Sequence, residues 1–192
     1  MNRPPTRASV FAPAPTTTTL TIAPPSRLHG LPPVVSASTR VLILGSFPGE
    51  ASLRAQQYYA HPRNQFWPIL QALWPQHPLP QLYADRCAWL LARGLGVWDV
   101  YASCERASSL DSAIRNPVAN DFVRLKADCL CLQRIVHNGG ESYRHAKWVR
   151  SSLAADLFPL VKLPSTSPAN AGWSLERKRG AWRDAMVQAG LL

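Results

Sequence analysis

The chain has 192 residues, enough for a single domain with a sizeable core, and 46% of them are hydrophobic and 17% charged, which excludes a fibrous or largely disordered protein. The formal net charge of +10 favours an anionic partner such as nucleic acid, although a solvated basic surface has the same composition. No apolar run approaches the roughly 18 residues of a membrane-spanning helix, so we expect a soluble, intracellular protein.

The chain begins with a segment that we expect to be disordered. Residues 1–27 are rich in Pro, Thr and Ala and show neither helical nor strand periodicity. We therefore predict a flexible basic tail followed by one folded domain over residues 28–192. The four cysteines lack the spacing of a zinc, redox or iron–sulfur site, so we expect no metal and no cofactor; they are Cys87, Cys104, Cys129 and Cys131.

Four short apolar runs recur along the folded part, with room for a helix between them. They are Val41–Leu44, Gly96–Trp98, Arg134–His137 and Leu160–Leu163. Short continuous runs are typical of buried parallel strands. Helical periodicity is found over residues 66–74, 83–92, 142–157 and 175–189. The pattern predicts an α/β fold, a three-layer α/β/α sandwich around a central, mainly parallel four-stranded sheet, with the chemistry in loops at the carboxyl ends of the strands.

The loop after the first strand reads Gly45-Ser46-Phe47-Pro48-Gly49-Glu50. Its two glycines and its proline favour a tight turn that exposes backbone N–H groups beside an aromatic ring, suited to an anion or a planar base. It is not a phosphate-binding loop, because no Gly-Lys-Ser/Thr follows. A hydrolase with Ser46 as nucleophile is disfavoured, because no general base or oxyanion motif accompanies that serine.

The next stretch, Tyr58 to Trp67, is dense in aromatic and polar side chains and precedes a helical pattern. Asn64 is a good N-cap for a helix that starts at Gln65. Pro68 opposes this interpretation, because it would remove a backbone donor in the first turn. From the residues alone, Asn64 is either a cap or a functional amide.

Two later loops also follow predicted strands. In His137-Asn138-Gly139-Gly140, the Asn138 amide both donates and accepts, which suits the edge of a base, although capping is the commoner use. The loop from Leu163 to Gly172 offers hydroxyl groups and backbone donors of the kind that position DNA phosphates. A set of basic residues follows it and extends a basic face: Arg177, Lys178, Arg179 and Arg183.

Together these loops resemble the uracil-DNA glycosylase superfamily, and within it the sixth family, the hypoxanthine or deoxyinosine DNA glycosylases. The resemblance runs from about Gly30 to Trp182. Its most specific parts are Gly45-Ser46-Phe47-Pro48-Gly49, Tyr58 to Trp67, and Leu163-Pro164-Ser165-Thr166-Ser167-Pro168-Ala169-Asn170, in this order.

The resemblance implies roles for particular residues. Mismatch-specific members read Gly-Ile-Asn-Pro-Gly in the first loop, and their Asn positions the attacking water; here Phe47 takes its place, and in the sixth family the role passes to the residue equivalent to Asn64. The resemblance also implies that Asn138 binds the polar edge of the base. The other expected base-binding residues are Gly45, Ser46, Phe47 and Phe66, the last two by stacking. The expected DNA-binding residues are Ser165, Ser167, Pro168, Ala169 and Asn170.

The implied activity is that of a monofunctional DNA glycosylase. It hydrolyses the N-glycosidic bond of a deaminated base in DNA, with hypoxanthine preferred, leaves an abasic site and so initiates base excision repair. We expect it to act on DNA as a cytoplasmic monomer, without contact to a membrane. Two alternatives remain open at this point, a uracil DNA glycosylase and a DNA-binding module without enzymatic activity.

Overall fold

The structure, a computed structural model, describes residues 27–154 and 158–192. Its centre is a four-stranded sheet with the order β3-β2-β6-β7, in which every neighbouring pair is parallel. The strands are β2 (Val41–Gly45), β3 (Leu95–Asp99), β6 (Arg134–Asn138) and β7 (Leu160–Leu163). Every residue of β2 and β3 is buried, as expected for strands that are covered on both faces.

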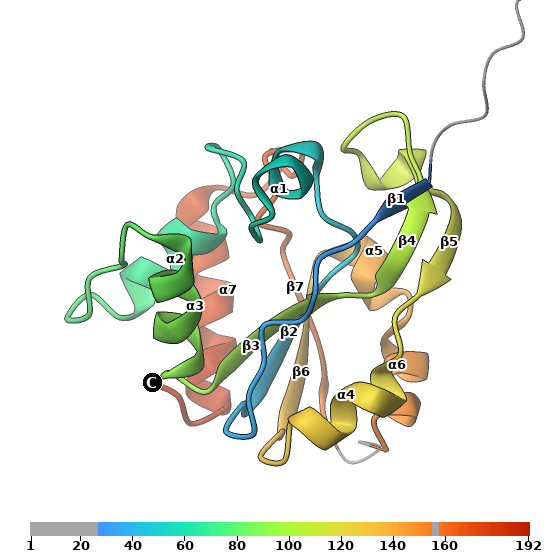
Figure 1. Ribbon diagram of the computed structural model, residues 1–192. Helices are drawn as coiled ribbons and strands as arrows, with labels where there is room; N and C mark the ends of the chain where they lie inside the picture. The colour runs from blue at the N-terminus through green and yellow to red at the C-terminus, as the bar shows by residue number, and fades with distance from the viewer. Residues whose placement is uncertain (1–26, 155–157) are drawn as a thin grey trace, which may run out of the picture.

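Helices cover both faces of this sheet, which confirms the three-layer α/β/α architecture (Figure 1). One layer holds α2 (Phe66–Leu73), α3 (Tyr83–Leu91) and α7 (Leu175–Gln188). The other holds α4 (Phe122–Asp128), α5 (Gly140–Tyr143) and α6 (Ala146–Ser152). Fully buried aromatic side chains pack between helices of one layer. For example, the rings of Phe66 in α2 and Trp182 in α7 meet edge to face.

The helix predicted over residues 142–157 is two helices, α5 and α6. Arg144 and His145 separate them, and the prediction for residues 155–157 falls outside the described residues. The imidazole Nε2 of His145 lies 2.7 Å from the Tyr101 hydroxyl of another element. A tertiary contact therefore holds the break, and the periodicity of the local sequence carries no sign of it.

A second, antiparallel sheet was not predicted from the sequence. Its strands have the order β1-β4-β5 and comprise β1 (Arg27–His29), β4 (Tyr101–Glu105) and β5 (Arg115–Ala119). Arg27, which we expected in the disordered tail, instead begins β1, so that prediction is wrong for this residue. Its guanidinium donates to Ser103 Oγ at 3.0 Å and lies 3.6 Å from the Glu105 carboxylate. The rest of the predicted tail, residues 1–26, falls outside the described residues.

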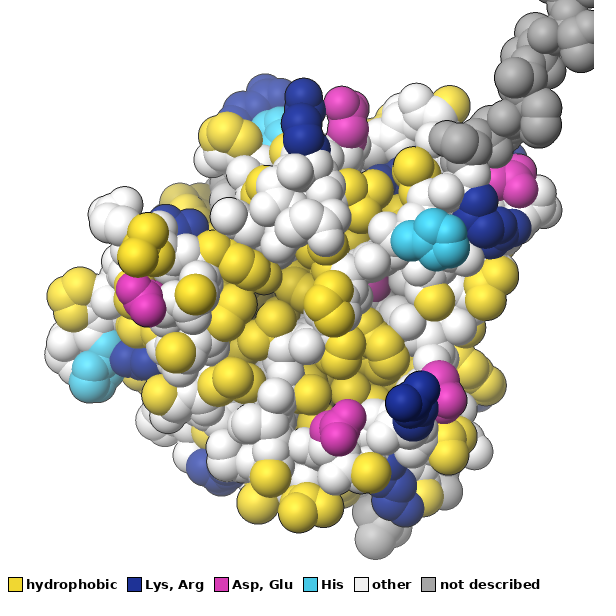
Figure 2. Space-filling view, in the orientation of Figure 1, with side chains coloured by type: hydrophobic (Ala, Val, Ile, Leu, Met, Phe, Trp, Pro, Cys, Tyr) yellow, Lys and Arg dark blue, Asp and Glu magenta, His cyan; other side chains and the backbone are white. Residues whose placement is uncertain are grey.

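Two further elements lie at the carboxyl ends of the parallel strands, α1 (Glu50–Ala55) after β2 and the loop between β4 and β5, which contains the short 3-10 helix η1 (Asp111–Ala113) (Figure 1). Figure 2 shows hydrophobic side chains gathered in the middle of the face turned to the viewer, with Lys and Arg nearer its rim. Among the described residues, no helix combines the length and the apolar character needed to span a bilayer.

Candidate active site

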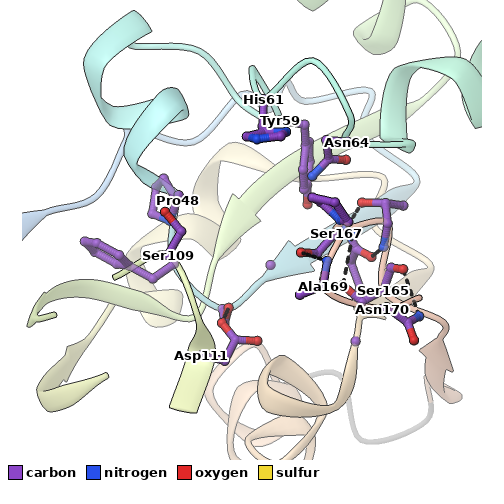
Figure 3. A pocket seen from close by; sticks show the side chains of 18 of the residues that line it. Pro48, Tyr59, His61, Asn64, Ser109, Asp111, Ser165, Ser167, Ala169 and Asn170 are labelled. Atoms are coloured by element: carbon purple, nitrogen blue, oxygen red, sulfur yellow. Dashed lines mark hydrogen bonds between the residues drawn. The ribbon is translucent and has the colours of Figure 1, made fainter. Parts of the chain in front are cut away.

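A cavity of about 810 Å³ opens where the parallel strands end. Its size falls in the range of small-ligand sites, roughly 300–1,000 Å³. Most of its lining comes from five segments, the loop after β2, residues 58–64, residues 109–112, the turn after β6 and the loop after β7, and Asp99 at the end of β3 adds to it. In Figure 3, Pro48, Ser109 and Asp111 lie on one side of the cavity, and Asn64 and Ser167 on the other. The three loops after predicted strands therefore meet at one site, together with residues of the stretch from Tyr58 to Trp67.

Asn64 lines this cavity and also binds the start of a helix. The helix begins at Phe66 with Gln65 at its N-cap position, so Asn64 lies one residue earlier than the sequence predicted and binds the first helical N–H from there. Its Oδ1 accepts the Phe66 N–H at 3.0 Å, in the first turn of α2. The N–H of the next residue, Gln65, donates to the carbonyl of Thr166 at 3.0 Å, which ties the start of α2 to the loop after β7. Among the described residues the amide nitrogen of Asn64 has no acceptor, so its N–H groups remain free for a ligand.

The first loop contributes three of the predicted residues, Gly45, Ser46 and Phe47, to the cavity wall. The Ser46 hydroxyl donates to Asp111 Oδ1 at 2.6 Å, so it is held toward the loop between β4 and β5. Phe47 is 6% exposed, and the guanidinium of Arg106 lies 5.1 Å from the centre of its ring. The loop therefore offers the ring of Phe47 as an aromatic surface, and Arg106 packs against that ring.

The structure gives Phe66 a different place from the one predicted. Its side chain has no exposed surface and does not line the cavity, and its ring stacks on that of Tyr59 with a centroid distance of 3.9 Å. Tyr59 does line the cavity, so a planar ligand would meet Tyr59 while Phe66 supports it from behind. Tyr59 also has a φ of 57°, in the left-handed region that few aromatic residues adopt. The alternation of aromatic residues in this stretch does not reveal which ring faces the cavity.

Asn138 lines the cavity at the end of β6, but most of its amide is already bound. Its Nδ2 donates to Thr166 Oγ1 and its Oδ1 accepts the Thr166 N–H, both at 2.9 Å. Asn138 is 8% exposed and Thr166 is fully buried. The pair therefore joins β6 to the loop after β7, and one amide N–H and one lone pair of Asn138 remain for a ligand.

The loop after β7 holds itself in shape through its own side chains. Ser165 Oγ accepts the N–H of Ser167, and Ser167 Oγ accepts the N–H of Ala169, both at 3.2 Å. Asn170 Nδ2 donates to the Ser165 carbonyl at 3.0 Å. These residues and Pro168, which the sequence predicted to bind DNA, line one wall of the cavity (Figure 3). Serine turns of this kind give a loop a defined shape without a regular element.

Lys178 does not belong to the exposed basic face that we expected after this loop. It is 1% exposed, and its Nζ donates to the Asn170 carbonyl at 3.0 Å. The reason is the helical period of α7, which turns position 178 to the same side as the buried Trp182. Lys178 therefore lies inside the protein and holds the loop after β7 through the Asn170 carbonyl.

Two buried titratable groups lie near the ends of β3 and β6. Asp99 lines the cavity, and its pKa is raised to about 8, chiefly by burial and then by the nearby Asp111 carboxylate, with Arg106 opposing. The pKa of His137 is lowered to about 4 by burial, and its Nδ1 lies 2.8 Å from Ser142 Oγ. Over residues 27–154 and 158–192, no three His, Cys, Asp or Glu side chains are grouped to hold a metal ion.

Comparison with known proteins identifies the family. The model of the uracil DNA glycosylase superfamily matches residues 32–188, which include every segment that lines the cavity. The chain belongs to this superfamily. The resemblance inferred from the loops is thereby confirmed.

Relatives within the superfamily match most of the chain. A protein named hypoxanthine DNA glycosylase from Methanosarcina barkeri (strain Fusaro / DSM 804) is 33% identical over 157 residues, 82% of this chain and 96% of the relative. A protein of the same name from Methanosarcina acetivorans is 33% identical over 150 residues, 78% of this chain and 92% of the relative. A solution NMR structure of a candidate uracil DNA glycosylase from Methanosarcina acetivorans is 31% identical, with a TM-score of 0.73, and covers 86% of this chain and 99% of that one.

Proposed function

We propose that this member of the uracil DNA glycosylase superfamily is a monofunctional DNA glycosylase that releases hypoxanthine from DNA and leaves an abasic site, the first step of base excision repair. The observation that carries the proposal is the cavity, whose aromatic wall and free amide N–H groups suit a planar base with polar edges. The two relatives named hypoxanthine DNA glycosylase support the choice of base.

Such an enzyme has to take the base out of the DNA stack, because the glycosidic bond is not accessible inside a duplex. Tyr59 and Phe47 provide the surfaces on which the extruded base stacks. Stacking on an aromatic side chain is worth about 1–3 kcal/mol per base and offsets a good part of the few kcal/mol needed for extrusion. A mismatched base costs less to extrude, which favours deaminated bases over normal ones.

Hydrolysis requires a water molecule and a stabilised leaving group. An asparagine amide does not titrate usefully, so Asn64 orients and polarises the water rather than deprotonating it. The bond between C1′ and the base nitrogen breaks first, and its electron pair leaves with the base. The water oxygen then bonds to the oxocarbenium-like C1′, and the proton that this water loses balances the one gained by the departing base.

The DNA strand is bound, in this proposal, by the loop after β7. The side chains of Ser165, Ser167 and Asn170 line the cavity, and each also makes a hydrogen bond that shapes the loop. Hydroxyl, amide and backbone N–H groups of this kind bind phosphates. We propose that Pro168 and Ala169 approach the strand at the same place, and that the protein acts as a cytoplasmic monomer without a cofactor.

The choice of substrate is tested with duplexes that differ in one base. We expect duplexes with deoxyinosine to lose the base fastest and duplexes with deoxyuridine to react more slowly, measured as strand scission after alkali across deoxyinosine, deoxyuridine and deoxyxanthosine at one salt concentration. Faster release of uracil would make the protein a uracil DNA glycosylase. Binding of all duplexes without release of any base would make it a DNA-binding module.

The same assay tests whether water is the nucleophile. Lys162 lines the cavity, and a lysine amine would attack C1′ to form a Schiff base. With water as nucleophile, the abasic strand stays intact until alkali is added, and borohydride traps no covalent complex. A trapped complex that disappears in Lys162→Met would overturn the monofunctional mechanism while leaving base release in place.

A further inference from the structure

Two buried polar groups without partners meet at the floor of the cavity. Asp99 is 4% exposed, and its Oδ2 is buried with no hydrogen-bond partner in the described part of the chain. The hydroxyl of Tyr59 is buried as well, and no group in the described residues binds it with good hydrogen-bond geometry; the Asn138 amide approaches it and lowers its pKa. A Cβ at position 45 would collide with Asp99 Oδ1 and lie 3.4 Å from the Tyr59 hydroxyl. The two groups thus flank one point, and only glycine at position 45 leaves that point open.

Over residues 27–154 and 158–192, the Asp99 carboxyl group makes no hydrogen bond that would explain its burial. The turn from β3 into β4 is held by backbone bonds, among them Val100 N–H to the Gly45 carbonyl at 2.9 Å. Asn120 Nδ2 donates to the backbone carbonyl of Asp99, not to its carboxyl group. A buried carboxyl group without a partner costs several kcal/mol or forces the group to be neutral. Unpartnered buried groups of this kind are found where a ligand completes the site.

The surroundings of Asp99 keep it protonated near neutral pH. Burial is the main cause of the raised pKa of about 8, Asp111 adds to it, and Arg106 opposes it. Arg106 compensates only in part, and its guanidinium also donates to the Pro48 carbonyl. Among the described residues, the phenols of Tyr58, Tyr59 and Tyr83 also interact with the carboxyl group, and their own pKa values are raised by burial. A neutral carboxyl group has one O–H donor and one acceptor oxygen.

The depth of the carboxyl group decides which edge of a base it meets. Asp99 is paired with Gly45 in the register of β3 and β2, below the rim formed by the loops. The sugar and the phosphates stay at the mouth of the cavity, so the edge that reaches the floor is the one opposite the glycosidic bond. In hypoxanthine this edge carries the O6 carbonyl and the N1–H, an acceptor beside a donor.

We propose that Asp99 is a catalytic residue that binds this edge, donating to O6 and accepting from N1–H. The proposal deepens the proposed glycosylase function and rests on it. When the glycosidic bond breaks, negative charge spreads onto O6, and a hydrogen bond from the acid strengthens as that charge grows. An ionised Asp99 would repel the same charge. Asp99 keeps its proton throughout, so no proton transfer is added to the hydrolysis.

Three variants test the proposal in single-turnover release from a deoxyinosine duplex between pH 6 and 10. The rate of the unmodified protein should fall with rising pH from about 8, because the donor is lost as Asp99 ionises. Asp99→Asn keeps a donor and an acceptor but does not titrate, so it should stay within about tenfold at pH 7 and lose this alkaline decline. Asp99→Ala should be about 100-fold slower at pH 7. Asp85 is an exposed carboxylate on α3, so the control variant Asp85→Asn should keep the rate of base release and its decline at alkaline pH.

A binding measurement gives a second readout that does not depend on catalysis. Free hypoxanthine should bind the unmodified protein about tenfold more tightly than 1-methylhypoxanthine, which lacks the N1–H, and Asp99→Ala should not distinguish them, as followed by NMR titration. A thermal unfolding transition in each variant shows that it is folded, and Asp99→Asn should unfold at a higher temperature than the unmodified protein at pH 7.

The possible failures are distinct. An unmodified protein that releases no base from deoxyinosine, deoxyuridine or deoxyxanthosine duplexes contradicts the glycosylase function itself. Two results would overturn the role of Asp99 and leave the glycosylase function standing. One is an alkaline decline in Asp99→Asn with the same midpoint as in the unmodified protein. The other is an undiminished rate of hypoxanthine release by Asp99→Ala. Equal binding of the two free bases by the unmodified protein overturns this role as well.

Discussion

At the scale of single residues, Asn64 combines two roles that the sequence presented as alternatives. A helix cap needs an acceptor, and Asn64 Oδ1 provides it to the Phe66 N–H. A water molecule in the cavity needs a donor or acceptor with a fixed direction, and the same cap bond fixes the direction of the amide. The cap therefore supports the catalytic role that we propose for the free side of the group.

Replacing Asn64 separates the two roles. Asn64→Ala should lower stability by about 1 kcal/mol through the lost cap and slow base release by roughly two to three orders of magnitude. Asn64→Asp keeps the acceptor, so its stability should stay close to that of the unmodified protein, but it lacks the N–H groups and should also be slow. Thermal unfolding and single-turnover release on the same preparation measure both effects. An unchanged rate for folded Asn64→Ala would reduce Asn64 to a cap.

At the scale of elements, Thr166 connects three parts of the site. Its N–H and Oγ1 bind the amide of Asn138 at the end of β6, and its carbonyl accepts the N–H of Gln65 at the start of α2. The residue itself lies in the loop after β7 and has no exposed surface. A displacement of this loop would therefore move Asn64 relative to the cavity.

Removing the Thr166 hydroxyl should weaken both the fold and the reaction. Thr166→Val leaves one N–H of the buried Asn138 amide without an acceptor, which should cost about 1–3 kcal/mol. Thr39→Val is a matched control, because Thr39 is also fully buried and its Oγ1 accepts the Ser36 N–H at 2.9 Å, before the start of β2 and away from the cavity. We expect both variants to lose stability in chemical denaturation and only Thr166→Val to release base more slowly. Equal rates in the two variants would contradict this role of Thr166.

At the scale of the whole molecule, the charge of +10 sets how the protein meets DNA. On the face shown in Figure 2, Lys and Arg are distributed around an apolar centre and do not form one block. At the cavity itself the described residues place few cations: Lys162 in the wall, Arg106 beside Phe47, and Arg177 stacked on Trp173 at 4.5 Å. We therefore expect charge to bring DNA to the surface and the cavity to select the base.

Salt should separate these two contributions. Each phosphate neutralised by Lys or Arg releases counterions, so log affinity for a duplex should fall against log salt with a slope of about −0.9 per phosphate contact. Binding of free hypoxanthine carries no phosphate and should change little over the same range. Fluorescence anisotropy for the duplex and NMR titration for the base give the two slopes. A flat duplex curve would contradict binding through the basic surface.

The sequence by itself determined the parallel sheet and the family. The four predicted strands agree with the structure to within one residue at each end, because a strand that is buried on both faces needs a continuous apolar run and such a run is visible locally. The antiparallel sheet was missed for the opposite reason. Every residue of β5 is exposed, so pairing with β4 and not an apolar pattern makes it a strand.

The site divides in the same way. Asn64 and the loops after β2, β6 and β7 were predicted, because the chemistry of their residues and their positions after strands are properties of short segments. Tertiary structure alone decided that Tyr59 and not Phe66 faces the cavity, that Thr166 holds three elements together, and that Asp99 is buried beside Gly45. Those facts depend on contacts between residues far apart in the chain, and burial and hydrogen-bond partners are set by such contacts and not by local sequence.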